Sequence, residues 1–423
     1  MASVFGFVHR NWQLLNPPVV PKTDDALKFG ILGAANIAPM ALIGPAKSHP
    51  DVVVQAVAAR DKSRAEAYAK KHGIPQVLDS YQAVLDDPSI DAVYIPLPNG
   101  LHYEWALKAL AKGKHVLLEK PSTSNAEEAA ALFRSPLLKR PGAPVLLEAF
   151  HYRFQPAWQC FLSLIDRPSV EHVRAVTRAP ALAFRKDDIR FRYGLAGGAL
   201  MDLGTYHASI LRGVFGAEPE ECLACSVETM APPHDELCDH TFRAMYRFPN
   251  GGTGEIDGSL QAPLLRAAFP RVEVTHRPVV VADGAEGLPE GQEKTRARKV
   301  SLANFMVANV WHRIDVEDEY VVRKKHTGEV VRRWREKQSR KAYTFREAGV
   351  DGQPDQEYWL SYRYQLEEFV NRVRGREGSG RWVSGEDSVA QMRMLDMTYE
   401  KSGLPLRRTS AFRLDAGGDT QAV

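Results

Sequence analysis

A carboxylate, an amine and a rigid proline, Glu119-Lys120-Pro121, directly follow the hydrophobic run His115-Val116-Leu117-Leu118. Such a run is typical of a buried parallel strand, and open α/β sheets bind ligands outside the carboxyl ends of their strands. A lysine at that place can bind a hydroxyl or carbonyl oxygen and take part in proton transfer. We therefore predict that Lys120 is catalytic.

A turn of small residues upstream indicates a nucleotide cofactor. Gly30-x-x-Gly33-x-Ala35-x-x-Ala38 is a degenerate dinucleotide fingerprint, in which small side chains let the backbone approach a pyrophosphate. Glycines between a strand and a helix can also serve packing alone, but this turn lies within a βαβ pattern. With Lys120 downstream, the turn predicts hydride transfer at an oxygenated carbon. The turn residues expected to contact the cofactor are Gly33, Ala35, Asn36 and Ile37.

The end of the second expected strand, Ala58-Ala59-Arg60-Asp61, indicates which cofactor is bound. NAD enzymes usually place a carboxylate here to hold the ribose 2′-hydroxyl, whereas this chain has Ala59 followed by Arg60. A guanidinium can pair with a 2′-phosphate and stack on adenine, so the sequence favours NADP over NAD. In the alternative, Arg60 is a solvated loop residue and Asp61 binds the ribose.

The elements that must position these residues belong to residues 27–150. This part alternates short apolar runs with helical patterns, which predicts a Rossmann-type, doubly wound parallel sheet. The expected strands are 28–32, 52–59, 92–96, 115–118 and 144–148, and the expected helices include 63–72, 102–111 and 125–133. Residues 1–26 contain Pro17, Pro18 and Pro21 and predict an extended N-terminal arm.

After residue 150 the pattern becomes rich in strands. We predict an α+β domain over 151–409 with a large, mostly antiparallel open sheet, a polar loop at 284–294 and a loose tail at 410–423. Asn250-Gly251 predicts a hairpin turn. The expected strands are 173–178, 222–229, 239–248, 253–260, 271–275, 299–303, 319–324 and 329–334, and the expected helices are 358–374 and 385–401.

Several ordered motifs resemble those of the Gfo/Idh/MocA oxidoreductase family. They are Pro96-Leu97-Pro98-Asn99-x-x-His102, Gly113-Lys114-His115-Val116, Glu119-Lys120-Pro121, Glu148-Ala149-Phe150, Tyr152-Arg153 and Gly197-Gly198-x-Leu200-x-Asp202-x-Gly204-x-Tyr206. The resemblance covers most of residues 27–403. Tyr206 stands where the inositol dehydrogenase branch has histidine, which is similar to the branch of dihydrodiol dehydrogenase, NADP-dependent D-xylose dehydrogenase and glucose-fructose oxidoreductase.

The resemblance implies roles for individual residues. Lys120 would contact substrate and cofactor, and Tyr206 would face the nicotinamide. The further cofactor contacts implied are Pro98, Asn99, His102 and Glu119, and the substrate contacts implied are Tyr152, Arg153, Asp202 and Tyr206. It also implies a homodimer or larger homo-oligomer, since the second sheet often forms the dimer surface in this family.

The chemistry of hydride transfer agrees with these roles. When hydride leaves a carbinol, the hydroxyl proton must leave too, and a phenol with its free pKa of about 10 is a poor base at neutral pH. We expect Lys120 to lower the pKa of Tyr206. Asp202 either orients the substrate or Tyr206, or is a favourable residue at a helix N-terminus. His207 is the alternative base, but its neighbouring position points it to another helix face.

Arg185, Arg190 and Arg192 precede the glycine pair and are compatible with substrate contact or with a solvated loop.

Composition excludes several other classes of protein. The chain has 423 residues, a formal net charge of +3 and 44% hydrophobic residues, so a dedicated nucleic-acid binder is not indicated. No apolar run approaches the length of a bilayer span, and the N-terminus lacks the apolar core of a secretion signal. Cys222-x-x-Cys225 could be taken for half of a zinc site, but positions three apart on a strand point to opposite faces, so we expect no metal. Four cysteines favour a cytoplasmic protein.

We therefore expect an NADP-dependent dehydrogenase or reductase acting on a small sugar-like or cyclic diol substrate, of the D-xylose 1-dehydrogenase or trans-dihydrodiol dehydrogenase type. One alternative is a redox enzyme acting on a larger pathway intermediate. Another is a regulatory protein of the same fold that binds NADP without turnover. Extra chain around residues 264–345 distinguishes this sequence from many relatives.

Overall fold

A computed structural model describes residues 4–281 and 288–414 of the chain. Its first sheet has six strands, all parallel, in the order β3-β2-β1-β4-β5-β6. The order reverses direction beside β1, which is the doubly wound arrangement predicted from the alternating pattern. The strands are β1 (Leu27–Leu32), β2 (Val52–Ala58), β3 (Gln76–Val77), β4 (Ala92–Ile95), β5 (His115–Leu118) and β6 (Leu146–Glu148).

Helices flank this sheet, and their ends follow local sequence signals. Asp61 caps α3 by accepting a hydrogen bond from the backbone of Arg64, and Gly73 ends the helix with φ at 70°. After β1 the chain forms a short π-helix, η1 (Pro39–Ile43), which continues directly into α2. The helices are α2 (Gly44–Lys47), α3 (Lys62–His72), α4 (Tyr81–Asp86), α5 (His102–Ala111) and α6 (Ala126–Phe133).

The second sheet has nine strands and is antiparallel except where β10 pairs with β7, so the predicted fold class is confirmed. Asn250 and Gly251 form the turn between β9 and β10, as predicted. The strands are β7 (Val170–Pro180), β8 (Glu221–Thr229), β9 (Asp239–Arg247), β10 (Thr253–Ala262), β11 (Ala268–His276), β12 (Val279–Val280), β13 (Gln292–Ala303), β14 (Arg313–Lys324) and β15 (Val330–Arg340).

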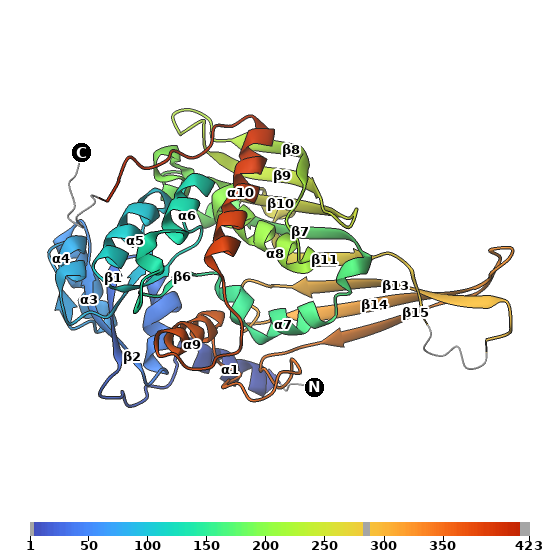
Figure 1. The fold of residues 1–423 in the computed structure, drawn as a ribbon, viewed down its shortest axis with the longest axis horizontal. Helices are drawn as coiled ribbons and strands as arrows, with labels where there is room; N and C mark the ends of the chain where they lie inside the picture. Colours follow the sequence, from blue (N-terminus) through green and yellow to red (C-terminus); the bar gives the residue numbers. More distant parts are fainter. Residues whose placement is uncertain (1–3, 282–287, 415–423) are drawn as a thin grey trace.

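Helices from the later part of the chain join the two sheets. The helix α10 runs between them in Figure 1 and contacts α6 on one side and β8 and α8 on the other. The helix α9 contacts η1 and α2 beside the first sheet. One continuous hydrophobic core contains residues of both sheets, including Phe29 and Ile256. The remaining long helical elements are α7 (Pro156–Ser163), α8 (Thr205–Phe215), α9 (Ser361–Val373) and α10 (Gly385–Ser402).

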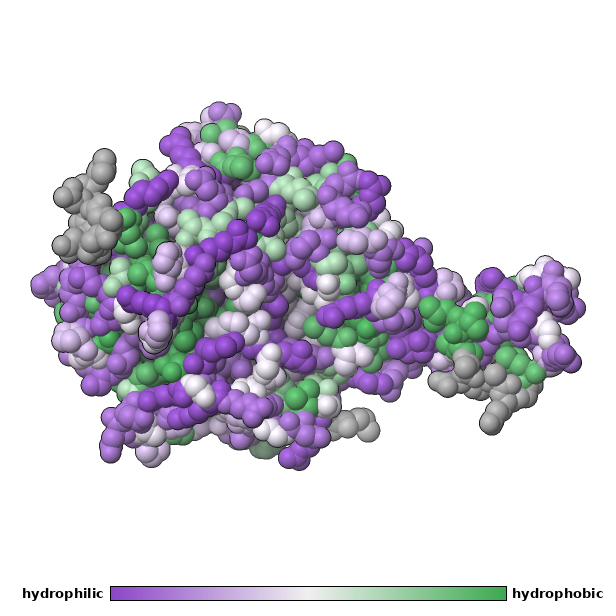
Figure 2. Space-filling view, viewed as in Figure 1, coloured by the Kyte–Doolittle hydropathy of each residue, from purple (hydrophilic) through white to green (hydrophobic). Residues whose placement is uncertain are grey.

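The strands β13, β14 and β15 extend beyond the body of the molecule as an arm (Figure 1). Figure 2 shows the arm projecting, with hydrophilic residues gathered at its tip. The polar loop predicted at 284–294 is wrong at its end, because 292–294 belong to β13 and pair with 322–324 of β14. Residues 284–287 lie outside the described residues. The pairing, rather than local composition, makes this polar segment a strand.

The N-terminal arm is not extended as predicted. It contains a helix, α1 (Val4–Leu15), and the three prolines follow that helix. Contacts with distant residues hold the helix: a guanidinium nitrogen of Arg10 donates to the Val310 carbonyl at 3.1 Å, and the guanidinium lies 3.4 Å from the centre of the Tyr343 ring. Tertiary packing of one helix face therefore decided the local structure.

The predicted loose tail is also partly wrong. The backbone nitrogen of Ser410 donates to Glu128 at 2.7 Å, and Phe412 and Leu414 pack against the core beside α5. The remainder of the tail, 415–423, lies outside the described residues. Within the described part of the chain, no helix is both long and apolar enough to cross a membrane.

Candidate active site

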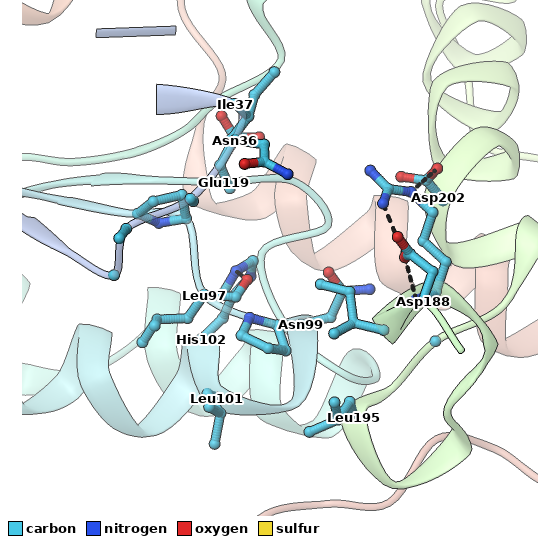
Figure 3. A pocket seen from close by; sticks show the side chains of 18 of the residues that line it. Asn36, Ile37, Leu97, Asn99, Leu101, His102, Glu119, Asp188, Leu195 and Asp202 are labelled. Atoms are coloured by element: carbon cyan, nitrogen blue, oxygen red, sulfur yellow. Dashed lines mark hydrogen bonds and ion pairs between the residues drawn. The ribbon is translucent and has the colours of Figure 1, made fainter. Parts of the chain in front are cut away.

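An open cavity of about 810 Å³ lies at the carboxyl ends of the first sheet's strands and is bounded on its other side by residues of the second domain. Figure 3 shows Asn36, His102 and Glu119 on one side of it and Asp188 and Asp202 on the other. Every predicted cofactor residue lines this cavity: Gly33, Ala35, Asn36, Ile37, Arg60, Pro98, Asn99, His102, Glu119 and Lys120. The structure therefore brings these residues together, although their individual roles stay predictions.

The turn after β1 can admit a pyrophosphate closely. Gly33 has φ at 111°, and a Cβ added there would lie 3.2 Å from Leu97 Cδ2. Ala34 and Ala35 follow it and also line the cavity. Glycine is the residue that adopts this backbone conformation without strain, so the turn is built for close backbone approach to a ligand.

The end of β2 presents positive charge to the cavity. Arg60 and Arg64 both line it, and Arg64 donates to the Ala34 carbonyl at 3.0 Å. Asp61, the alternative ribose ligand, accepts hydrogen bonds from Ser63 Oγ at 2.8 Å and from the Arg64 backbone at 3.2 Å. Both bonds go to Oδ1 and Asp61 also lines the cavity, so a ribose contact by this carboxylate stays an alternative prediction beside Arg60.

The loop after β4 is fixed by a buried histidine. His102 is fully buried, and its two ring nitrogens each lie 2.8 Å from a backbone carbonyl, of Pro121 and of Leu97. Burial lowers the pKa of His102 to about 4, although the two carbonyl contacts favour its charged form. The side chain joins the loops after β4 and β5. Asn99 then links this loop to the second domain by donating to the Ala196 carbonyl at 2.9 Å.

Lys120 stands at the end of β5 and reaches across to the second domain. Its Nζ donates to Asp202 Oδ1 at 2.9 Å and to the Asp202 carbonyl at 3.1 Å. The neighbouring Glu119 accepts a hydrogen bond from the Tyr94 hydroxyl at 2.7 Å. Burial raises the pKa of Glu119, opposed by the Tyr94 hydrogen bond and the Lys120 charge.

Asp202 lies in the π-helix η9 (Leu200–Gly204) and binds two cations. Lys120 contacts one carboxylate oxygen, and Arg190 Nε donates to the other at 3.0 Å. Burial raises the pKa of Asp202, but the two cations outweigh burial and hold that pKa well below its usual range. Of the two sequence interpretations, the contacts favour an orienting role over a helix-terminal one. Arg190 also binds Asp188 at 3.0 Å, so this side of the cavity carries balanced charge.

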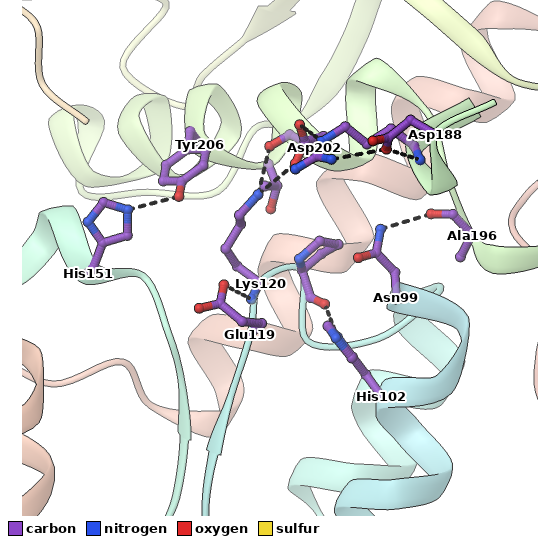
Figure 4. Close-up of polar contacts among 12 residues, drawn as sticks. Asn99, His102, Glu119, Lys120, His151, Asp188, Ala196, Asp202 and Tyr206 are labelled. Atoms are coloured by element: carbon purple, nitrogen blue, oxygen red, sulfur yellow. Dashed lines mark hydrogen bonds and ion pairs between the residues drawn. The ribbon is translucent and has the colours of Figure 1, made fainter. Parts of the chain in front are cut away.

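Tyr206 lines the cavity from the start of α8, with Lys120 Nζ 4.8 Å from its ring centre. Its hydroxyl lies 2.9 Å from Nε2 of His151 (Figure 4). The expectation that Lys120 lowers the pKa of this phenol is wrong for this structure. Burial raises the pKa of Tyr206 well above its ordinary value, and nearby acidic groups add to the rise. The Lys120 ammonium is engaged with Asp202, whose negative charge offsets it.

Three other candidates lie outside the cavity lining. Tyr152 donates to Ser209 Oγ at 2.8 Å, and Arg153 binds Asp387, so the structure does not bring these two predicted substrate residues to the cleft. Both lie within the short 3₁₀ helix His151–Phe154, where successive side chains point in different directions. His207 is buried against Thr177, with its Nε2 2.9 Å from Oγ1, as expected for a packed histidine.

Sequence reasoning missed several residues at or beside the cavity. Arg64 and Tyr362 line it, and His151 lies behind Tyr206. The signal for Arg64 was its place in the first turn of α3, directly after the strand end that carries Arg60. Of the three arginines before the glycine pair, Arg190 is the one that lines the cavity.

The cysteines near the second sheet are unpaired in this structure. Cys222 and Cys225 on β8 both pack against the hydrophobic core, so the prediction that they point to opposite faces is wrong. The register between β8 and β9 is irregular between Cys222 and Ala224, which brings both cysteines to the same face of the strand. Among residues 4–281 and 288–414, no group of three or more histidine, cysteine or acidic side chains is arranged to hold a metal ion.

Comparison with known proteins identifies the family. Residues 27–137 match the family model described as "Oxidoreductase family, NAD-binding Rossmann fold", and residues 169–276 match the "GFO/IDH/MocA C-terminal domain". The chain is 37% identical over 253 residues to "D-xylose 1-dehydrogenase (NADP(+)) 2" of Haloferax volcanii, covering 59% of this chain and 74% of that protein. The chain therefore belongs to the Gfo/Idh/MocA oxidoreductase family, which confirms the resemblance.

Two further comparisons agree. The chain is 30% identical over 246 residues to the trans-1,2-dihydrobenzene-1,2-diol dehydrogenase of Mus musculus, covering 58% of this chain and 72% of that protein. Its fold is similar to a solved 3-ketoreductase from Actinomadura kijaniata in complex with NADP and TDP-benzene, with a TM-score of 0.67 and 20% identity, covering 89% of this chain and 98% of that chain. NADP in the name of the Haloferax relative and in the solved complex agrees with the cofactor predicted from Arg60.

Proposed function

We propose that this protein is an NADP-dependent oxidoreductase that transfers a hydride between the nicotinamide and an alcohol or carbonyl carbon of a neutral, sugar-like or cyclic diol substrate. The observation that carries the proposal is the convergence of Lys120, Asp202 and Tyr206, from separate domains, on the cavity that contains the cofactor turn. Sequence similarity to a D-xylose dehydrogenase and a dihydrodiol dehydrogenase supports a sugar-like or cyclic diol substrate.

The cofactor end of the cavity fits a dinucleotide phosphate. The turn at Gly33 has the small side chains that a pyrophosphate requires, and Arg60 and Arg64 offer two guanidinium groups to a 2′-phosphate. Bound there, NADP supplies the nicotinamide that accepts or donates hydride. The protein supplies the binding, the orientation and the proton.

The second-domain side supplies the polar groups for the substrate. Lys120 can donate its remaining proton to the oxygen of the reacting carbon, while Asp202 holds the ammonium in place. Tyr206 offers a hydroxyl that exchanges the substrate's hydroxyl proton. In the reducing direction the phenol gives its proton to the nascent alkoxide, and in the oxidising direction the proton returns to the phenolic oxygen.

The charge balance favours a neutral substrate. Lys120 and Arg190, the cations on this side, are both paired with Asp202, and Arg190 also binds Asp188. An anionic group such as a diphosphate would have to displace these carboxylates. The Actinomadura structure contains TDP-benzene, so a larger nucleotide-linked intermediate is the second candidate. A regulatory protein that binds NADP without turnover is the third.

The test is a spectrophotometric screen with purified protein. NADPH formation or consumption is followed with neutral sugars, cyclic diols, ketones and a nucleotide-linked sugar. Turnover with neutral polyols or diols supports the proposal. Turnover with the nucleotide-linked sugar alone favours the second candidate, and NADPH binding without any turnover favours the regulatory one.

The Lys120→Met variant makes this test specific to the site. It should keep the fold and much of the NADPH affinity while turnover falls by about a hundredfold or more, because the substrate oxygen loses its charged donor. Lys108→Met is the matched control, since Lys108 is a similarly buried lysine that pairs with Glu104 on α5 and does not line the cavity. Normal turnover in Lys120→Met would show that the lysine is structural.

Two proposals concern the setting of the enzyme. By family resemblance we propose a homo-oligomer that forms through the second sheet, which multi-angle light scattering tests directly. A monomer at micromolar concentration would contradict it.

We also propose a reducing, cytoplasmic location, which the unpaired state of Cys160, Cys222, Cys225 and Cys238 supports. Fractionation of the source cells checks that location.

A further inference from the structure

A buried histidine stands directly behind the phenol of the proposed site. His151 is 2% exposed, its Nε2 lies 2.9 Å from the Tyr206 hydroxyl, and its Nδ1 lies 2.8 Å from Ser361 Oγ. The ring stacks on Tyr362, with ring centres 3.9 Å apart. Figure 4 shows His151 and Lys120 on different sides of Tyr206. His151 is thus held at three points and contacts the hydroxyl from the side away from Lys120.

The protonation of this histidine limits what it can do. Burial, with a smaller contribution from the Lys120 charge, lowers the pKa of His151 to about 3. The ring is therefore neutral near pH 7, with one nitrogen that donates and one that accepts. Either Nε2 donates to the phenol and Nδ1 accepts from Ser361, or both bonds run in the opposite direction. The direction decides where the proton of Tyr206 points.

The surroundings of the phenol make one direction productive. If the phenol donates to His151, its proton points away from the cavity. If Nε2–H donates instead, the phenolic proton is left for the substrate, and the same hydrogen bond stabilises the phenolate that forms when that proton leaves. Among the described residues, His151 forms the hydrogen bond to this hydroxyl. The charged and titratable groups that influence Tyr206 from the surrounding elements are Lys120, Glu119, Asp202, Tyr152 and Tyr362.

We propose that His151 is a positioning residue that donates its Nε2 proton to Tyr206 Oη, directs the phenolic proton into the cavity and stabilises the phenolate. The inference rests on the proposed function. In the reducing direction the phenolic O–H bond breaks, the proton forms the O–H bond of the product alcohol, and the electron pair stays on Tyr206. The hydride comes from the nicotinamide cofactor, and water restores the phenol when the product leaves.

Two substitutions separate this role from the alternatives. His151→Phe keeps a ring that can stack on Tyr362 but has no donor, whereas His151→Gln keeps an N–H near the position of Nε2 and cannot take up a proton. We expect kcat to fall by about ten- to hundredfold in His151→Phe, with KM and NADPH affinity little changed. The rise of the oxidation rate with pH should move upward by about one pH unit or more. His151→Gln should retain kcat to within about threefold and keep the original pH profile.

His207→Gln is the matched control. His207 is equally buried, bonds Thr177 and lies outside the cavity, so the pH profile should not move. An unchanged profile in His151→Phe would overturn the inference. His151→Gln as slow as His151→Phe would also overturn it, because the histidine would then act by taking up a proton.

A second measurement does not depend on turnover. Nitrogen-15 spectra of histidine-labelled protein report which ring nitrogen carries the proton, and His151→Gln identifies the signals. We expect a protonated Nε2 and a bare Nδ1. A protonated Nδ1 would overturn the inference even in an active enzyme. If the wild type turned over no neutral polyol or diol, the proposed function would fail, while the spectra would still decide the tautomer.

Discussion

The polar side chains around Asp202 form a connected set rather than a collection of free groups. Lys120, Asp202, Arg190 and Asp188 follow one another through contacts of 2.9 to 3.0 Å. Each cation is therefore held in place before a ligand arrives, which reduces the reorganisation that the reaction requires. As a consequence, the charge of Lys120 is offset by Asp202. Lys120 therefore affects the pKa of Tyr206 less than the sequence indicated.

Cofactor choice is a prediction about one residue. Replacing Arg60 with alanine should remove a charge-assisted contact worth about 1.5–3 kcal/mol, so the preference for NADPH over NADH should fall by about ten- to hundredfold. The remaining preference should come from Arg64. Fluorescence titration with both cofactors measures the ratio.

Lys62→Ala is the control for this prediction. It removes one positive charge at the start of α3, two residues after Arg60. Lys62 pairs with Asp79 and does not line the cavity. The control should keep the wild-type ratio of affinities. Equal affinities for NADPH and NADH in the unmodified protein would contradict the assignment of NADP.

Single residues could be predicted where they follow a strand directly. Gly33, Arg60 and Lys120 come one or two residues after β1, β2 and β5, and parallel strands end at the same edge of a sheet. His151 could not be predicted in this way, because its contact with Tyr206 spans 55 residues and depends on how α8 docks against the end of β6. The resemblance alone predicted Tyr152 and Arg153 in the cleft, and the turn at residue 151 directs them elsewhere.

At the scale of elements, periodicity located the buried parts of strands but not their ends. In β13 and β14 the predicted parts, 299–303 and 319–324, cover about half of each strand. The rest of β13 is mostly polar, whereas the alternation of Ile314 and Val316 in β14 is too short to have been recognised. Their partners stabilise them: Arg298 binds Asp318 through two contacts of 2.8 Å, and Tyr320 stacks on Trp334 at 5.0 Å. Such cross-strand pairs are invisible until the register is known.

The end of β6 supports the loop that carries Lys120 and should make stability depend on pH. Glu148 is fully buried and accepts a hydrogen bond from the Ser122 backbone at 2.8 Å, two residues after Lys120. Burial raises the pKa of Glu148 from 4.5 to about 7, against the opposing effect of its hydrogen bonds. Between these two values the folded protein keeps a proton that the unfolded chain has released. The contribution of Glu148 to the free energy of unfolding is therefore complete below pH 4.5. It decreases as the pH rises from 4.5 and is lost once the pH has passed 7. The total change is about 3 kcal/mol.

Glu148→Gln should remove that dependence, because the amide stays neutral at every pH. Relative to the wild type, the variant should gain stability progressively from pH 4.5 to pH 8, by up to about 3 kcal/mol. Urea midpoints measured across this range give the difference. Glu66→Gln, an exposed position on α3, is the control and should run parallel to the wild type. A parallel curve for Glu148→Gln would contradict the prediction.

At the scale of the whole molecule, each end of the chain crosses to the other domain. The helix α1 packs beside Val310 and Tyr343, and the chain then returns to the first sheet, where Lys22 Nζ donates to the His49 carbonyl at 2.8 Å. At the other end, Ser410 binds Glu128 beside the first sheet. Strand and helix patterns predicted the two sheets, and the family resemblance implied a cleft between the domains. Neither predicted this exchange, because it depends on contacts between residues far apart in the sequence. The division at residue 150 stays a prediction, since the hydrophobic core is continuous across it.

The N-terminal contact predicts a loss of stability without a loss of cofactor binding. Arg10 is 6% exposed, bonds the Val310 carbonyl and lies over the Tyr343 ring. Arg10→Ala should lower the free energy of the first unfolding transition by about 1–3 kcal/mol. The substitution removes the buried guanidinium, so the Val310 carbonyl loses its hydrogen-bond donor and the Tyr343 ring loses its cation. NADPH affinity should not change, since α1 does not line the cavity. Val8→Ala, on the exposed side of the helix, is the control. Thermal unfolding of the two variants tests the prediction. Equal unfolding temperatures for Arg10→Ala and Val8→Ala would show that the contacts of Arg10 do not stabilise the fold, and that α1 does not help to hold the two sheets together.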